Sequence, residues 1–351
     1  ELPAGAADET YAGVVLTFAS TGLPAGNAGV STNSAARSFS IEGVGDGEYD
    51  LQATYGTREG TLSASVPQRV SVRGADVTGL RLSLVALGSA AGTLVIEPAS
   101  EAERARAECK AVPAAPRRPQ ETIVAATPER GPAAKSIFSR FGFAHEATPE
   151  EAGGFALRTL EAGRYHVSAR LFDEALYLRA VEQPGTASLA APSVSPRASA
   201  AAATRTNSAP LSRETFDLKA GQQLSGIVVR LSEGAASFAG RVAPAEGASA
   251  QTPAPTRVYL VPQERERAED PLRYYETTVS DSAFVFRNVA PGRYFVLARA
   301  VAEAGDAPQR PAAWDTEARA GLRREAEAAK TPAELLPCQR TADFVLRFPP
   351  K

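Results

Sequence analysis

Apolar and polar residues alternate along this chain in short runs, and three of these runs share one pattern. Each has a phenylalanine, a glycine eight positions later, and then tyrosine, an aliphatic residue and alanine at every second position. The copies carry Phe39, Gly47 and Tyr49; Phe155, Gly163 and Tyr165; and Phe284, Gly292 and Tyr294. A period of two places alternate side chains on one face of a β-strand, so each copy predicts a strand whose buried face holds the tyrosine.

The repeated glycine predicts a hairpin turn before that strand. In the third copy the glycine follows Pro291, and a Pro-Gly pair is typical of a type II turn with a positive φ at the glycine. This turn would join a strand through Phe284 to one through Tyr294. We expect Gly163 to have the same conformation.

Further aliphatic runs surround each copy in the same order. Closing strands are predicted at Leu80–Leu84, Ile227–Leu231 and Phe344–Phe348, opening strands at Gly92–Ile96 and Gly240–Val242, and second strands at Val14–Leu16, Ile123–Ala125 and Val258–Val261. Short strands separated by Gly and Pro, with few helices, are typical of antiparallel β-sandwiches. The sequence predicts an all-β fold of three tandem sandwich modules of immunoglobulin-like or transthyretin-like type, at 1–86, 87–233 and 234–351.

The first module lacks a counterpart of the opening strand. Only Glu1–Gly13 precede its second strand, with Pro3 and Gly5 early and no aliphatic alternation. A sandwich without this strand exposes unpaired backbone groups and apolar core. We expect the strand to come from an upstream domain or from another subunit, with the arm Leu2–Tyr11 as its donor.

Three other segments depart from the strand pattern. Asp315 is a predicted N-cap for a helix at 315–330, in which Leu322 and the preceding Trp314 would pack on a sheet edge or seam. Glu101–Cys109 predicts two helical turns that end before a run of prolines. Residues 184–213, rich in Ala, Ser, Pro and Thr, predict a long mobile loop.

Composition limits the possible functions. The 351 residues carry 38 basic and 40 acidic side chains, so no nucleic-acid-binding surface is indicated, and two histidines with two cysteines argue against metal sites. No apolar stretch is long enough to span a membrane. Because the chain contains no methionine, Glu1 is not a translated start, and we expect export with a signal segment that this chain does not contain.

No group of residues predicts catalysis or a cofactor. The chain has no Gly-x-Ser-x-Gly and no His-Glu-x-x-His motif. His145 is expected in a loop, and His166 on the solvent face of its strand, opposite Tyr165. Asp46, Glu48 and Asp50 suggest either calcium or a plain polar face opposite Tyr49 and Leu51; because the other copies lack these carboxylates, we prefer the polar face.

The cysteines lie in different modules, Cys109 in the second and Cys338 in the third. Three arrangements are open: a disulfide between the modules, two free thiols, or links to other chains. We favour the disulfide, which would restrict the unfolded chain by about 5 kcal/mol in the entropic description.

The repeated Phe, Gly, Tyr and Ala pattern resembles carboxypeptidase regulatory-like domains, relatives of the transthyretin-like and collagen-adhesin B-type sandwiches of bacterial envelope proteins. The third module, with Gly240–Val242, Val258–Pro262 and Trp314, is the most similar. The resemblance implies a non-catalytic accessory domain that spaces, adheres or binds glycans. The lysine–asparagine isopeptide bonds of the adhesin relatives are not expected, since no suitable pair is present.

These observations predict a non-enzymatic, exported structural or assembly protein of the bacterial cell surface, such as a filament subunit joined by strand complementation. Its partners would be copies of itself or a neighbouring envelope protein. The alternative is a carbohydrate- or protein-binding accessory module of a larger secreted protein. Polymers in solution would favour assembly, and discrete monomers would favour the binding module.

Overall fold

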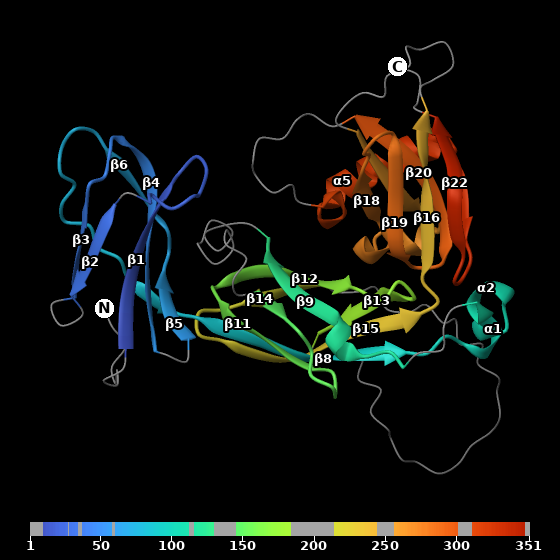
Figure 1. Ribbon diagram of the computed structural model, residues 1–351, viewed down its shortest axis with the longest axis horizontal. Coiled ribbons are helices and arrows are strands. Elements are labelled where there is room, and N and C mark those ends of the chain that lie inside the picture. The colour runs from blue at the N-terminus through green and yellow to red at the C-terminus, as the bar shows by residue number, and fades with distance from the viewer. Residues whose placement is uncertain are drawn as a thin grey trace, which may run out of the picture. The chain divides into compact units, whose positions relative to one another are not determined.

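The computed structural model describes residues 10–26, 28–33, 37–57, 60–111, 116–129, 145–183, 214–243, 256–300 and 311–347. The predicted loop at 184–213 and most of the arm Leu2–Tyr11 lie outside these residues. The described chain consists of several β-sheets with few helices (Figure 1). This confirms the predicted all-β fold class.

The chain divides into two compact units, each assembled from three segments. Unit 1 contains residues 1–93, 122–170 and 214–227, and unit 2 contains residues 94–121, 171–213 and 228–351. The long strands β8 (Gly88–Glu97) and β15 (Gln223–Glu233) belong partly to each unit. The predicted boundaries at 86/87 and 233/234 fall between strands, and the division into three modules stays a prediction.

Within unit 1, the first copy of the repeat forms a five-stranded sheet and a separate hairpin. The sheet has the order β1-β4-β5-β7 with β6 paired to β4, and the hairpin is β2-β3. The bounds are β1 Thr10–Phe18, β2 Gly29–Asn33, β3 Ser38–Glu42, β4 Gly47–Thr57, β5 Gly60–Ser65, β6 Gln68–Val72 and β7 Leu84–Ala86. Leu16, Tyr49, Leu51 and Val70 form its buried cluster, as the alternation of β1 and β4 predicts.

The predicted closing strand at Leu80–Leu84 is wrong for all but its last residue. Only Leu84 lies in a strand, β7, which pairs with β5. Leu80 and Leu82 still pack, partly buried, against the cluster of the first copy. In the other copies the closing strand pairs with an opening strand, and the described residues of the first copy contain none.

The second copy forms two four-stranded sheets, with the orders β10-β9-β12-β14 and β11-β8-β15-β13. The bounds are β9 Thr122–Pro128, β10 Glu146–Ala147, β11 Gly154–Leu160, β12 Gly163–Leu171, β13 Leu176–Glu182 and β14 Thr215–Leu218. In unit 1 the ring of Tyr165 on β12 stacks on Phe216 of β14, with centroids 5.4 Å apart. The repeat tyrosine is therefore part of the interior.

The third copy, in unit 2, is a β-sandwich of a three-stranded and a four-stranded sheet. Their orders are β19-β16-β22 and β18-β17-β20-β21, with β16 and β22 parallel. The bounds are β16 Ala236–Ala243, β17 Thr256–Pro262, β18 Tyr275–Thr278, β19 Ala283–Val289, β20 Gly292–Ala300, β21 Pro332–Leu335 and β22 Arg340–Arg347. Both sheets contribute to one core, in which Phe238 and Phe284 of the first sheet meet Val258 and Tyr294 of the second.

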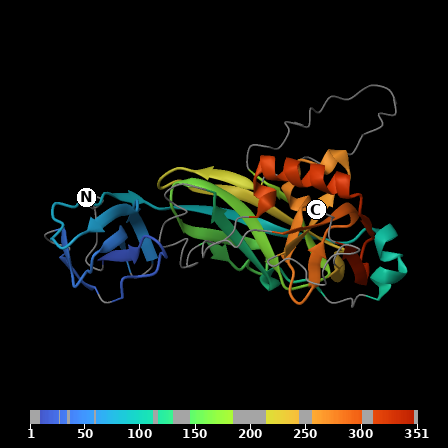
Figure 2. The same cartoon turned by 90° about the horizontal axis from the view of Figure 1, so that it is seen from above.

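The helix predicted at 315–330 is α5, Thr316–Ala329, with Asp315 as its N-cap (Figure 2). The sequence suggested that this helix packs on a sheet edge or seam, and that prediction is wrong. Leu322 and Ala326 lie against Tyr259 of β17 and Leu297 of β20, so the helix covers the outer face of the four-stranded sheet. Trp314 ends the short turn η4 (Ala312–Trp314) before the helix and is half-buried.

The remaining helical segments are short. They are α1 Glu101–Arg104, α2 Ala107–Lys110, and the 3-10 turns η1 Pro119–Glu121, η2 Arg265–Arg267 and η3 Pro271–Arg273. A capping box between Ser100 and Glu103 begins α1. Among the described residues, no helix has the length and apolar character needed to cross a bilayer.

Candidate functional site

The repeat phenylalanine packs over a glycine of the opening strand in the second and third copies. Phe155 lies opposite Gly92 in the β11–β8 pair, and Phe284 lies opposite Gly240 in the β19–β16 pair. A Cβ at Gly92 would lie 2.7 Å from Cζ of Phe155, a Cβ at Gly240 would lie 2.8 Å from Cζ of Phe284, and each would lie closer still to a backbone carbonyl oxygen. The opening strand therefore requires glycine at this position.

The first copy differs at this place. Its phenylalanine, Phe39, lies on β3, which pairs with β2 and with no other strand in the described part of the chain. Phe39 is half-buried, whereas Phe155 is 6% and Phe284 is 2% exposed. Among the described residues, no strand covers this ring as β8 and β16 cover the other two.

The hairpin partner β2 does not replace the opening strand. It places Thr32, not a glycine, opposite Phe39, and all five of its residues are exposed. The Thr32 hydroxyl donates a hydrogen bond to the carbonyl oxygen of Ala12 at 3.2 Å, which keeps β2 beside β1. In the third copy the corresponding strand β18 belongs to the other sheet, where it pairs with β17.

We call Phe39, Ile41, Leu80 and Leu82 the open edge of the first copy. All four pack, partly buried, around the cluster formed by Leu16, Tyr49, Leu51 and Val70. In the third copy the place between the phenylalanine strand β19 and the closing strand β22 is filled by β16, which buries Ala236, Phe238 and Val242 in the core.

The repeat tyrosines are buried and use their hydroxyl groups in the same way. Each hydroxyl donates a hydrogen bond to the carbonyl oxygen four residues earlier: Tyr49 to Gly45 at 2.9 Å, Tyr165 to Glu161 at 2.9 Å, and Tyr294 to Ala290 at 2.7 Å. Burial raises the pKa of Tyr294 well above its ordinary value, so the hydroxyl stays protonated as a donor. This bond closes the turn of each copy, as in a tyrosine corner.

The turn conformation differs from the prediction. Gly292 has a positive φ of 155°, but Gly163 has no positive φ. The residue in the left-handed region lies four positions before the repeat glycine in every copy: Gly43 at 73°, Thr159 at 61° and Asn288 at 55°. The chain therefore reverses earlier than the Pro-Gly pair suggested, and a glycine is present there only in the first copy.

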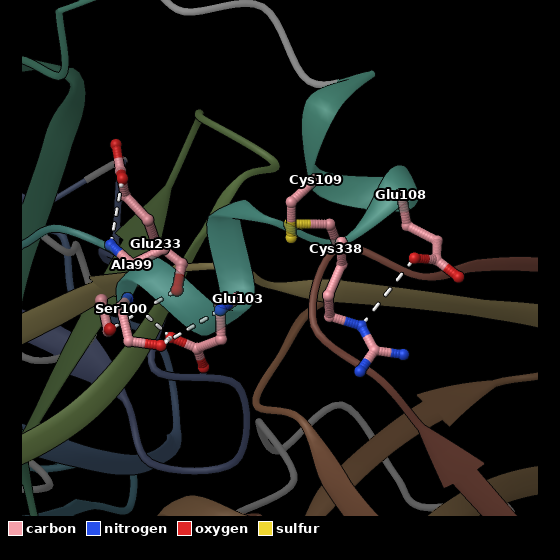
Figure 3. The surroundings of a disulfide bond; sticks show 9 residues. Ala99, Ser100, Glu103, Glu108, Cys109, Glu233 and Cys338 are labelled. Atoms are coloured by element: carbon pink, nitrogen blue, oxygen red, sulfur yellow. Dashed lines mark hydrogen bonds and ion pairs between the residues drawn. A yellow bond between two sulfur atoms is a disulfide. The ribbon is translucent and has the colours of Figure 1, made fainter.

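Cys109 and Cys338 are joined by a disulfide within unit 2 (Figure 3). Cys109 lies on α2 and Cys338 in the turn between β21 and β22, with a Cα–Cα distance of 5.0 Å. The backbone N–H of Cys338 also donates to the carbonyl oxygen of Gly234 at 3.0 Å, between β15 and β16. The sequence left three arrangements of the cysteines open, and the structure contains the first of them, a disulfide between Cys109 and Cys338.

Polar contacts within the same unit involve the turn that precedes β13. Asn288 donates from Nδ2 to the carbonyl oxygens of Asp173 and Leu176, both at 2.7 Å. Glu174 forms ion pairs with Arg340 at 2.8 Å and with Arg287 at 3.5 Å. These contacts join the turns of the third copy to the turn before β13.

A second set of contacts is more enclosed. The carboxylate of Glu233 accepts from the backbone N–H of Ala99 at 3.2 Å and from Nε of Arg117 at 3.3 Å. Arg117 also lies 2.9 Å from Asp173, and both side chains are about 15% exposed. We call the disulfide together with these two sets of contacts the junction.

Both histidines are buried, which contradicts the expectation of a solvated His166. His166 is 2% exposed, and its Nδ1 lies 3.9 Å from the Glu214 carboxylate. Its strand β12 is an inner strand of the sheet, between β9 and β14, and the Glu214 side chain lies beside the imidazole. His145 is 8% exposed, lies edge-on to Tyr165, and burial lowers its pKa to about 4.

The acidic residues around Gly47 do not share one solvent face. Asp50 is buried, and its carboxylate accepts a hydrogen bond from Nε of Arg69 at 2.7 Å. Asp46 accepts from the backbone N–H of Gly74 at 2.6 Å, and Glu48 is exposed. Within the described ranges, no group of three or more metal-ligating side chains occurs.

Comparisons with known proteins identify no family. No family model and no curated protein matches this chain. The carboxypeptidase regulatory-like resemblance therefore stays a prediction.

Several solved structures show weak likeness to the chain. The TIE protein of Bacillus anthracis is 9% identical with a TM-score of 0.21; the match covers 99% of this chain and 49% of that one, so this chain spans about half of its length. GBS52, the minor pilin of Streptococcus agalactiae, is 9% identical with a TM-score of 0.22 and coverages of 75% and 97%. Two B repeat units of the collagen binding protein of Staphylococcus aureus are 9% identical with a TM-score of 0.21 and coverages of 84% and 64%. Likeness at these TM-scores carries no argument about function.

Proposed function

We propose that this chain is a non-enzymatic, exported structural protein of the bacterial cell surface that assembles by strand addition. Its partners would be further copies of itself or a neighbouring envelope protein. The chain would contribute packed β-sheets to a filament and use no cofactor.

The open edge of the first copy carries this proposal. The second and third copies bury their phenylalanine under a glycine-bearing strand. The first copy leaves Phe39 half-buried at an edge of β3 that has no strand partner among the described residues. Unpaired strand edges next to apolar side chains bind extended segments, because main-chain hydrogen bonds provide affinity and side-chain pockets provide specificity.

The junction supports a location outside the cytoplasm and a mechanical role. Disulfides persist in oxidising compartments, and this one closes a loop of 229 residues. An ion pair and a hydrogen bond of the junction hold the third copy to the turn before β13. A subunit that bears load benefits from such cross-links.

Purified chain tests the proposal directly. Sedimentation velocity and negative-stain microscopy across a range of concentrations should show linear polymers that grow with concentration. A single monomeric species at all concentrations would contradict assembly and would favour the alternative, an accessory module that binds carbohydrate or protein.

A further inference from the structure

We propose that residues Pro3–Asp8 of a second copy of this chain fill the open edge, antiparallel to β3, with Gly5 opposite Phe39. The inference rests on the proposed function and adds to it the donor segment and its register.

The strand that the open edge requires is defined by the other two copies. Its inward side carries an apolar residue, glycine, and a second apolar residue at alternate positions. In β8 these are Ala90, Gly92 and Leu94, and in β16 they are Phe238, Gly240 and Val242. Of these three positions, the glycine tolerates substitution least, because a Cβ there would meet both the phenylalanine ring and a neighbouring backbone.

The N-terminal arm has this pattern in the sequence. Pro3, Gly5 and Ala7 stand at alternate positions, so glycine is flanked by apolar residues as in β8 and β16. The arm has no larger aliphatic residues at these positions, but the glycine matters more for the fit against Phe39. Pro3 would be the first residue of the strand, where proline is tolerated.

The structure shortens the donor segment expected from the sequence. Thr10 and Tyr11 already pair with Thr57 and Gly56 in the β1–β4 ladder, so they are not free for another sheet. The donor is therefore restricted to Leu2–Glu9.

The length of the connection favours exchange between two copies. Gly5 lies five positions before Thr10, the first residue of β1. The corresponding separations are 16 positions from Gly240 to Thr256 and 30 from Gly92 to Thr122. A connection this short must return from one sheet to the other across about 10 Å, and short hinges favour swapping of a strand into a second molecule.

A matched pair of substitutions tests the register. Gly5→Val places a side chain against Phe39 and should lower the polymer fraction about tenfold or more at fixed concentration. Ala4→Val adds the same side chain at the neighbouring position, which faces away from the core, and should leave the polymer fraction near that of the unchanged chain. Equal polymer fractions for the two variants would overturn the register.

Cysteine pairs distinguish a second copy from self-closure. The register places Ala4 opposite Ser40, and opposed residues on antiparallel strands lie within disulfide range. Mixing chains that carry Ala4→Cys with chains that carry Ser40→Cys should give a covalent heterodimer on a non-reducing gel, whereas Ala4→Cys with Glu42→Cys, displaced by two residues, should give far less. An intramolecular Ala4–Ser40 cross-link in the double variant, with monomers only, would overturn the exchange.

A peptide experiment gives a readout that does not require polymers. A chain lacking residues 1–9 keeps all of β1, and a synthetic peptide of residues 1–9 should raise its melting temperature, while the same peptide with Gly5→Val should not. Polymers of the full chain without any peptide effect would contradict the donor and leave the assembly function standing. A peptide effect with a monomeric full chain would contradict the proposed function and leave the strand site standing.

Discussion

At the scale of single residues, the repeat tyrosine shows how much one side chain contributes to a turn. Its position in an alternating run predicts burial, and Tyr49, Tyr165 and Tyr294 are indeed interior residues. Its hydroxyl bonds to the carbonyl four residues earlier, and in every copy the turn begins with a residue in the left-handed conformation. Because Thr159 and Asn288 occupy that conformation in two copies, composition alone does not reveal it.

His145 makes stability depend on pH. Its pKa is about 4 in the folded chain because of burial, against an ordinary value of 6.5 that applies to the unfolded chain. The unfolded chain therefore binds the proton first as the pH falls. The free energy of unfolding should be unaffected by this group above pH 6.5 and should decrease by up to about 3 kcal/mol towards pH 4.

Urea unfolding at pH 7 and pH 4.5 measures this effect. His145→Gln removes the titrating group, so its free energy of unfolding should change less over this range than that of the unchanged chain. Identical pH dependence for both proteins would show that folding does not lower the pKa of His145.

Gly292 and Gly163 occupy the same position of the repeat but differ in conformation. Gly292→Val should lower stability by more than about 1 kcal/mol, because its φ is positive and a Cβ would meet the guanidinium of Arg273. Gly163→Val should cost less, since Gly163 lacks the positive φ. Thermal melting of the two variants compares them, and an equal or larger loss for Gly163→Val would contradict this account.

At the scale of elements, the opening strand shows a conflict between local preference and packing. Glycine weakens a strand, yet β8 and β16 each carry one where the phenylalanine ring lies on the backbone. The helix α5 shows the opposite case. A Cβ added at its Gly321 would meet no atom within 4 Å, so glycine there serves no packing purpose.

Alanine at these two kinds of glycine should therefore have effects of opposite sign. Gly240→Ala should destabilise the chain by about 1–3 kcal/mol, because the Cβ overlaps Phe284 and the backbone of β22. Gly321→Ala should stabilise it by about 0.5–1 kcal/mol through helix propensity. Chemical denaturation measures both, and a neutral Gly240→Ala would show that the sheets move apart easily.

At the scale of the whole molecule, each compact unit combines segments that lie far apart in the sequence. Unit 2 contains the third copy, α1, α2 and the turn before β13, and the junction joins them. Such long-range links restrict the unfolded chain more than local contacts do.

Removing the disulfide should lower the stability of unit 2. The variant with Cys109→Ala and Cys338→Ala should lose about 2–5 kcal/mol, since the loop of 229 residues is no longer closed. Its unfolding transition should match that of the unchanged chain after reduction. If reduction and substitution both leave the transition unchanged, the disulfide contributes nothing to stability.

The sequence by itself determined the features that depend on local order. Period-two runs located β1, β4, β12, β17 and β20, and the Asp315 cap with its periodic face located α5 within one residue at each end. These features follow from backbone geometry and capping, which act over a few residues.

Only the tertiary structure decided whether the strand face opposite the repeat tyrosine is covered. His166 and Asp50 point away from the face of the repeat tyrosine, and both are buried because neighbouring segments bring Glu214 and Arg69 over them. Leu80–Ser83 do not form a strand, and the described residues contain no opening strand with which they could pair. Cys109 meets Cys338 because the path of the chain brings them together. Burial and pairing depend on segments distant in sequence, and no local pattern contains that information.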